Sequence, residues 1–351
     1  MQLRLLAGIL VCLSSLCCLT AEIFAEDIAF PPAAGAVDVR EKFGAKGDGV
    51  TDDSDALQRA FFEVKGKGLV LYFPNGIYLV SRTIFIGGDA LSVMPVASRA
   101  HSSDRFMHLQ GQSQSGSIIR LRDASPGFND AKQVKVMISL YDGQGTGDAM
   151  HSSVRNLTFE VGAGNPGAAA LRFLSNNTGC IFDVTIRSRD PKYAGAIGLD
   201  LRQGQQGPEF IRDVTIEGFD RGVETGDTFA TVFEHLTLRN QNEVGFFNPW
   251  GRATIRDLVS RNRVPVIKSG KDSPLTVVGG DFSGGDAGTS AIIVEGHQVF
   301  LRDLKQTGYG AIVEDAGKKR IAGATLKEWC DGGEQGLFTE NRTSLRLAVK
   351  D

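Results

Sequence analysis

Three charged residues recur at matching places of an apolar pattern in the middle of the chain. Arg172, Asp200 and Glu224 each directly follow an apolar residue in three short segments of similar pattern. If these segments stack as neighbouring strands, their matching side chains lie about 4.8 Å apart. Two carboxylates at such a distance repel each other when ionised, so one of the pair is expected to resist ionisation. Acid–base cleavage of a glycosidic bond uses two carboxyl groups in different ionisation states. The spacing therefore identifies Asp200 and Glu224 as a candidate pair for chemistry of this kind.

Polar and aromatic residues close to this pair extend the candidate site. Further charged groups, Asp220 among them, widen the polar patch, and aromatic rings offer flat apolar surfaces on which sugars stack. A column of surface charge that binds no ligand is the alternative interpretation. The predicted catalytic residues are Arg172, Asp200, Glu224 and Asp227, and the predicted substrate-binding residues are Arg221, Glu243, Phe247 and Trp250.

A short repeated phrase supplies the strands that must position these residues. The phrase alternates β-branched and polar residues between glycine-rich turns, a pattern typical of β-strands. Its copies return every 20 to 30 residues, and so short a repeat buries its apolar face only by stacking on its neighbours into a solenoid. Glycine, Asn and Asp at the corners favour an all-β parallel β-helix, and the lack of a leucine ladder argues against leucine-rich repeats. The copies centre on Leu157, Val184, Val214, Leu236, Leu258, Gly280, Leu304 and Ala324.

Most of the Arg-Asp pairs in the chain fall at one place in this phrase. They occur at Arg212-Asp213, Arg256-Asp257 and Arg302-Asp303. Adjacent opposite charges relieve the repulsion that a stacked column of like charges would suffer. These pairs are therefore predicted to form an outer, salt-bridged ladder that belongs to the scaffold.

The segment before the repeats combines a glycine-rich turn with a short helix. Between Phe43 and Asp53, three glycines allow tight backbone turns. Asp52 or Asp53 is placed to accept the unpaired amides of a helix start, and apolar residues at helical spacing follow from 56 to 61. The pattern predicts a short N-terminal helix that caps the first coil.

This segment resembles the opening signature of the pectate-lyase-like superfamily, which includes pectate lyase 3, polygalacturonase, rhamnogalacturonase and family 55 glucanase domains. The pattern Phe-Gly-Ala-x-Gly-Asp-Gly-x-x-Asp-Asp is matched by Phe43 to Asp53, and Phe-Pro-x-Gly-x-Tyr by Phe73 to Tyr78. The resemblance implies a right-handed parallel β-helix and cleavage of a pectin-like or glucan-type polysaccharide by hydrolysis or β-elimination. The four motifs of polygalacturonase-type hydrolases are not matched, which makes hydrolysis of pectin by that apparatus doubtful.

Three functional alternatives follow. In hydrolysis, Asp200 and Glu224 would be acid and base; in elimination they would hold calcium, with Arg172 or Arg221 at the carboxylate of an acidic sugar. No other cofactor or metal is expected. The third alternative, favoured by the missing hydrolase motifs, is a non-catalytic module that binds glycan or serves as a surface scaffold.

Composition and the chain ends limit the possible partners. The net charge of −3 gives no basic footprint for nucleic acid.

Residues 1–25 have the layout of a signal peptide, with Arg4 before an apolar run that is too short to span a bilayer. The prediction is a secreted protein, extracellular or periplasmic, with no membrane contact after cleavage, and with a β-helix domain at 36–330 and a tail or cap at 331–351. The oligomeric state stays open. Cys180 is predicted to be an apolar core residue.

Overall fold

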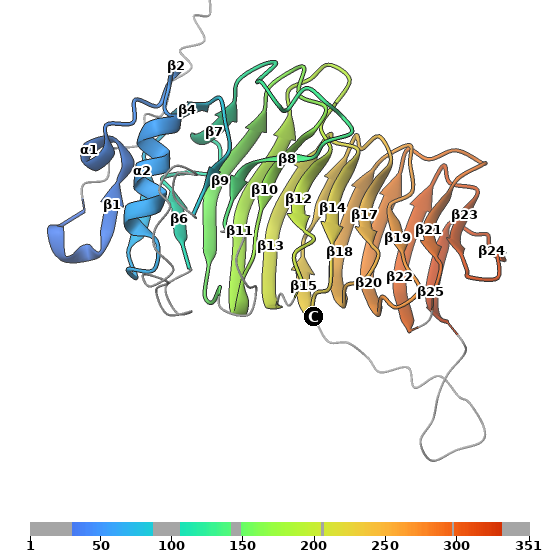
Figure 1. Cartoon of the computed structure of the whole chain (residues 1–351). Coiled ribbons are helices and arrows are strands. Elements are labelled where there is room, and N and C mark those ends of the chain that lie inside the picture. The colour runs from blue at the N-terminus through green and yellow to red at the C-terminus, as the bar shows by residue number, and fades with distance from the viewer. Residues whose placement is uncertain (1–29, 87–105, 142–148, 205–206, 297, 332–351) are drawn as a thin grey trace, which may run out of the picture.

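The computed structural model describes residues 30–86, 106–141, 149–204, 207–296 and 298–331 of the 351-residue chain. The strands of these residues wind into successive coils that stack along one axis (Figure 1). The fold is the predicted right-handed parallel β-helix. Because each strand pairs with its counterpart in the next coil, the described residues form a 15-stranded sheet, sheet A, and a 10-stranded sheet, sheet B.

The elements have the following bounds. The helices are η1 (Pro32–Ala34), α1 (Val39–Phe43) and α2 (Ser54–Val64). Sheet A contains β1 (Ala36–Asp38), β2 (Asp48–Asp52), β3 (Val70–Phe73), β4 (Gly76–Val80), β6 (His108–Gly111), β7 (Ser117–Leu121), β9 (Ser153–Val161), β11 (Asn176–Ser188), β13 (Gly207–Glu217), β15 (Thr231–Glu234), β16 (Thr237–Arg239), β18 (Ala253–Arg261), β20 (Leu275–Ser283), β22 (Val299–Thr307) and β25 (Thr325–Cys330). Sheet B contains β5 (Ile84–Phe85), β8 (Lys135–Ser139), β10 (Ala168–Arg172), β12 (Ile197–Leu201), β14 (Arg221–Thr225), β17 (Val244–Asn248), β19 (Ile267–Ser269), β21 (Ser290–Val294), β23 (Ala311–Glu314) and β24 (Arg320–Ile321).

One position of the repeated phrase has a left-handed backbone in every coil from β9 to β22. The strand register skips this residue, so the chain bends there within sheet A. L-residues avoid positive φ, but Gly, Asn and Asp tolerate it best. This requirement explains the residue types at the position, which are Asn156, Asp183, Asp213, His235, Asp257, Gly279 and Asp303, with φ of 51°, 56°, 54°, 52°, 55°, 77° and 52°.

The predicted ladder of Arg-Asp pairs is confirmed. The arginine and aspartate side chains lie 3.2 Å apart in Arg212–Asp213, 3.4 Å in Arg256–Asp257 and 3.4 Å in Arg302–Asp303. Each pair is partly exposed, so its contribution to stability is modest, about 0–1 kcal/mol. The aspartates therefore serve the scaffold chiefly through their left-handed backbone.

The backbone requirement gives a direct test at Asp183. We expect Asp183→Ala to destabilise the protein by about 1 kcal/mol relative to Asp183→Gly, because alanine pays the steric cost of the left-handed conformation and glycine does not. Urea unfolding of both variants measures this difference. If the alanine variant were as stable as the glycine variant, the bend would not depend on φ at this position.

The N-terminal helices cover the first coils. The apolar face of α2, which includes Leu57, belongs to the same buried cluster as the strands, and α2 lies against α1, β3 and β5 (Figure 1). Asp52 accepts a hydrogen bond from the Ser54 amide at the start of α2 (3.0 Å), as predicted. Asp53, the other residue considered for this role, instead accepts the amides of Lys46 (2.6 Å) and Gly47 (2.9 Å) and so closes the glycine-rich turn.

The last predicted copy of the repeat, centred on Ala324, does not form a parallel coil. A turn at Asp315–Lys319 reverses the chain, so that β24 runs antiparallel to β23 and β25 antiparallel to β22. The repeated phrase in this segment has the same composition as the other copies, but the chain has reversed its direction before it. Composition does not reveal such a reversal. The predicted signal peptide, and the predicted tail beyond Asp331, lie outside the described residues.

Glu209 on β13 lies inside the coil, with 2% of its surface exposed. The Ser175 amide donates to Oε1 (3.2 Å), and the Thr231 hydroxyl lies 3.5 Å from Oε2. Burial raises the pKa of Glu209 to about 8, although both hydrogen bonds act in the opposite direction. The side chain is therefore largely protonated at neutral pH.

We expect Glu209→Gln to stabilise the protein at alkaline pH. Because the pKa is raised from 4.5 to about 8 on folding, the folded state binds more protons within this window, and the stability of wild type falls as pH rises through it. At pH 9 the variant should exceed wild type by at most about 5 kcal/mol, and below pH 4.5 the two should match. Urea unfolding at pH 4, 7 and 9 measures the effect, with the half-exposed Glu295→Gln as control. A difference that is constant with pH would contradict the raised pKa.

Candidate functional site

The predicted alignment of Arg172, Asp200 and Glu224 is confirmed. The three residues pair in register across β10, β12 and β14 of sheet B, and Phe247 on β17 follows Glu224 in the same row. The preceding residue in each strand belongs to the core, so the row lies on the outer face of the sheet. The sequence pattern thus identified which side chains stack there.

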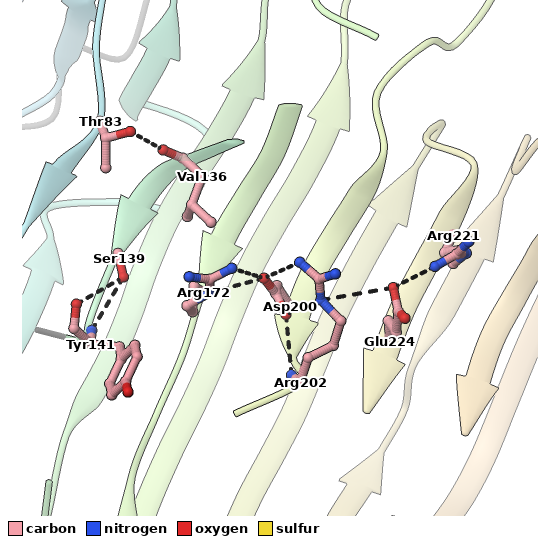
Figure 2. A network of polar contacts seen from close by, with 9 residues as sticks. All are labelled: Thr83, Val136, Ser139, Tyr141, Arg172, Asp200, Arg202, Arg221 and Glu224. Atoms are coloured by element: carbon pink, nitrogen blue, oxygen red, sulfur yellow. Dashed lines mark hydrogen bonds and ion pairs between the residues drawn. The ribbon is translucent and has the colours of Figure 1, made fainter. Parts of the chain in front are cut away.

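Asp200 is fully buried and is contacted by two arginines, Arg172 and Arg202 (Figure 2). Arg172 lies 2.8 Å from Oδ2, and Arg202 donates to Oδ1 through Nε (2.9 Å) and to Oδ2 through Nη2 (3.1 Å). Burial by itself would raise the pKa of Asp200, but the Arg202 hydrogen bonds and the two guanidinium charges outweigh it and hold the pKa below its usual value. Asp200 therefore does not resist ionisation, and it lacks the property that a proton donor needs.

Arg202 is a member of this network that the sequence prediction missed. It lies just after β12, two residues beyond Asp200, and its Nε also lies 3.9 Å from Oε2 of Glu224. Residues two apart in a strand point to the same face, so the segment Leu199-Asp200-Leu201-Arg202 contained a signal for it. Its guanidinium group lies between the two adjacent carboxyl groups and reduces the repulsion that their charges would otherwise cause.

Arg221 connects Glu224 to a second, more exposed carboxylate. Its Nη1 lies 2.8 Å from Oε2 of Glu224, and its Nε lies 3.2 Å from Oε2 of Glu243. The Glu224 side chain is 8% exposed and that of Glu243 is 55% exposed. The guanidinium group also lies 5.3 Å from the centre of the Phe247 ring, a cation–π contact that fixes its plane. One arginine thus holds a buried and a solvent-accessible carboxylate together.

Asp220, next to Arg221, has the opposite electrostatic environment to Asp200. Its carboxyl group is half-buried, and the Asn242 amide donates to Oδ1 (3.4 Å). Burial raises the pKa of Asp220, the negative charge of Glu243 raises it further, and the Asn242 hydrogen bond and Arg221 offset only part of this. The backbone brings the two acids together, since the Glu243 amide donates to the Asp220 carbonyl (2.9 Å). The starts of β14 and β17 thus combine a carboxyl group whose pKa is raised with a second, more exposed carboxyl group.

The remaining predicted site residues lie at the other ends of these strands. Asp227 is exposed in the turn after β14, and Trp250 is 62% exposed in the turn after β17. Neither forms a hydrogen bond or ion pair with the network of Arg172, Asp200, Arg202, Glu224, Arg221 and Glu243 in the part of the chain that the structure describes. Phe229, also exposed, shares the turn of Asp227. This second aromatic residue was missed, although it directly follows the predicted strand and turn.

The architecture and its opening segment agree with a comparison to protein families. A model of the family described as rhamnogalacturonase A/epimerase, pectate lyase-like matches residues 36–266, which is more than half of the chain. The chain belongs to the rhamnogalacturonase A/epimerase, pectate lyase-like family. The predicted resemblance to the pectate-lyase-like superfamily is therefore confirmed.

Two curated relatives are similar to this member of the rhamnogalacturonase A/epimerase, pectate lyase-like family. A glucan 1,3-beta-glucosidase from Cochliobolus carbonum is 24% identical over 355 residues, which cover 88% of this chain and 40% of the relative. A probable glucan endo-1,3-beta-glucosidase from Arthroderma benhamiae is 28% identical over 227 residues, which cover 59% of this chain and 23% of the relative. The chain thus spans less than half the length of these curated relatives.

Solved structures similar to this family member share its fold. The enzymatically active domain of tailspike protein 2 from bacteriophage CBA120 has a TM-score of 0.55 at 12% identity, over 77% of this chain and 38% of that one. ORF18 of Geobacillus virus E2 has a TM-score of 0.50 at 16% identity, over 82% of this chain and 63% of that one. At these identities the similarity concerns the β-helix alone.

The candidate site of this pectate lyase-like chain does not suit the calcium that elimination was predicted to require. Calcium takes six to eight oxygen ligands, but the carboxyl groups of Asp200 and Glu224 are each bound by arginine. The guanidinium groups of Arg172 and Arg221, which were expected to contact the sugar, are in turn bound by these carboxyl groups. Among the described residues, no group of three or more His, Cys, Asp or Glu is placed to hold a metal ion. No helix in the same residues is long and apolar enough to cross a membrane.

Proposed function

We propose that this protein is a glycan-degrading enzyme whose site lies where β14 and β17 begin, on the outer face of sheet B. One observation carries the proposal: the raised pKa of Asp220 beside Glu243, a carboxylate that Arg221 holds. Two carboxyl groups whose surroundings favour different ionisation states are the requirement for acid–base cleavage of a glycosidic bond. Membership of the rhamnogalacturonase A/epimerase, pectate lyase-like family supports the same conclusion.

From the environments of these side chains we infer their roles in hydrolysis. Asp220 donates its proton to the glycosidic oxygen of the leaving sugar. Glu243, which solvent reaches, accepts a proton from the water that attacks the anomeric carbon. Arg221 holds Glu243 in place and is itself anchored by the buried carboxylate of Glu224. In this assignment the ion pairs of Asp200 with Arg172 and Arg202 are a rigid support.

The names of the relatives suggest the first substrate to test. Both curated relatives are named as enzymes that act on 1,3-β-glucan, so we propose a glucan of this type ahead of pectin. The exposed rings of Phe229 and Trp250 offer stacking surfaces for sugar units. Trp250 thus stays a proposed substrate-binding residue, while Asp227 has no assigned role.

A panel of purified polysaccharides tests this proposal. The protein is incubated with 1,3-β-glucan, pectin and cellulose, and both reducing ends and the absorbance of unsaturated sugars are followed. Release of reducing ends from 1,3-β-glucan without unsaturated products is expected. Unsaturated products would assign the protein to elimination instead. Binding without cleavage of any polymer would favour the non-catalytic glycan-binding module.

We also propose that the protein is exported, to the cell exterior or the periplasm. The support is the signal-peptide pattern of residues 1–25. Expression of the full-length chain in a bacterial host, followed by N-terminal sequencing of the exported protein, tests it; a mature protein that retains Arg4 would contradict signal cleavage.

A further inference from the structure

A pocket of about 510 Å³ lies on the outer face of sheet A, away from the sheet B site. Its floor is formed by neighbouring strands, because His108 on β6, Ser153 on β9 and Cys180 on β11 pair in register. His151 and Arg155 complete its polar lining. The pocket therefore collects two imidazoles, a guanidinium group and several hydroxyls, and the described residues that line it include no aspartate or glutamate. The predicted core position of Cys180 is wrong, since an outward-facing strand position places it at this partly exposed surface.

Arg155 forms no ion pair among the described residues, whereas the arginines at the equivalent position of later coils do. Arg155 occupies the same row of the β-helix as Arg212, Arg256 and Arg302, which each form an ion pair with the following aspartate. The residue that follows Arg155 is Asn156, which keeps the left-handed backbone but carries no charge. Among the described residues Arg155 has no ion pair, and its Nη2 lies 3.5 Å from Cys180 Sγ, a weak acceptor.

The ring of Phe182 orients this free guanidinium group. The Arg155 guanidinium carbon lies 4.7 Å from the ring centre, and Arg212 lies at the same distance from that ring. Stacking of this kind holds the plane of an arginine while leaving its N–H groups available. Apart from the weak contact of Nη2 with Cys180 Sγ, the N–H donors of Arg155 are thus left available for a ligand.

The two histidines supply further donors in a positive environment. The Nδ1 atom of His108 lies 2.9 Å from the Ser153 hydroxyl, and that of His151 lies 2.5 Å from the Thr178 hydroxyl. Burial lowers the pKa of His108, and the charges of His151 and Arg155 lower it further. A bound anion would relieve this repulsion, and each imidazole can donate through a ring N–H.

We propose that this pocket binds an oxyanion group, a carboxylate, phosphate or sulfate, carried by a small ligand, with Arg155 as the principal donor. Arginine suits such groups because its planar fork of N–H donors matches two oxygens at once. The pocket volume lies within the 300–1,000 Å³ typical of small-molecule sites. The inference is independent of the proposed glycan cleavage, because the pocket is on the other sheet.

Calorimetric titration of the full-length protein tests the proposal. The probes are sodium glucuronate, phosphate and sulfate, with glucose as the neutral control at matched ionic strength. At least one anion should bind at 1:1 stoichiometry, and glucose should not. Arg155→Gln should weaken that binding at least tenfold, whereas Arg256→Gln, which removes a paired arginine from the same row, should leave it unchanged. The probe that binds identifies the oxyanion.

Alkylation of Cys180 provides a second readout that does not depend on turnover. The bound anion should slow the reaction of iodoacetamide with Cys180, relative to Cys330, which lies outside the pocket, and Arg155→Gln should abolish this protection. Mass spectrometry of tryptic peptides separates the two thiols. No binding of any of the three anions, binding unaffected by Arg155→Gln, or equal binding of glucose would each overturn the proposal.

Discussion

Asp220→Asn is expected to lower kcat, for the glycan that the wild-type protein cleaves, by roughly 100- to 10,000-fold. Asparagine keeps the size and the hydrogen bond to Asn242 but has no acidic proton to give to the leaving sugar. Because the acid works only when protonated, wild-type activity should fall as pH rises through the raised pKa of Asp220, and the variant should lack this alkaline limb. Initial rates on the active polymer from pH 3 to 8 measure both effects.

A substrate with a reactive leaving group separates loss of the acid from loss of structure. An aryl glycoside with a nitrophenol leaving group departs with little protonation, so Asp220→Asn should lose far less activity on it than on the polymer. Asp272→Asn, an exposed aspartate in the turn after β19, serves as the matched control with unchanged rates. Equal losses on both substrates would rule out Asp220 as the proton donor.

The second large effect is expected on stability. Asp200→Asn should lower the free energy of unfolding by about 3 kcal/mol, because breaking a buried ion pair leaves charge without compensation, here that of Arg172 and Arg202. In contrast, Glu243→Gln removes an exposed carboxylate and should cost less than about 1 kcal/mol. Urea unfolding at pH 7 compares the two variants.

The pH dependence of the same variant gives an independent check. The pKa of Asp200 is lowered on folding from 3.8, so its contribution is fully present above that value and is lost as pH falls through the lower, folded value. Wild type and Asp200→Asn should therefore converge in stability as the pH drops below 3.8. A gap that persisted in strong acid would show that the aspartate acts by shape rather than charge.

The alignment of Arg172, Asp200 and Glu224 in sheet B could be predicted from the sequence, because the alternation of inward and outward residues in a strand is a local property. Apolar residues must face the core, so the residue after each one is forced outward, and Arg172, Asp200 and Glu224 align as a result. The same reasoning predicted the Arg-Asp ladder. It did not reveal that Asp257 and its equivalents serve a left-handed bend, although their restriction to Asn, Asp, His and Gly contained that information.

The ionisation states could not be predicted in this way because they depend on side-chain contacts. Asp200 and Glu224 are adjacent, as expected, yet Arg202 lies between their charges and removes the expected repulsion. The raised pKa falls on Asp220 instead, through burial and the charge of Glu243. Likewise, the sheet A pocket unites residues up to 112 positions apart, from Gly68 to Cys180, and no local pattern brings such residues together.

The reversed strands at the C-terminal end of the described solenoid bear on how copies of the protein meet. A stack of parallel strands ends in an edge of unpaired N–H and C=O groups, which is a template for another chain. Here β25 covers the edge of β22, and β24 that of β23, both in the antiparallel sense. A further coil added in the solenoid's own direction could pair with β25 only in the antiparallel sense, which would break the parallel stacking of the coils. This arrangement disfavours head-to-tail growth of the protein into filaments, a risk inherent in any open repeat.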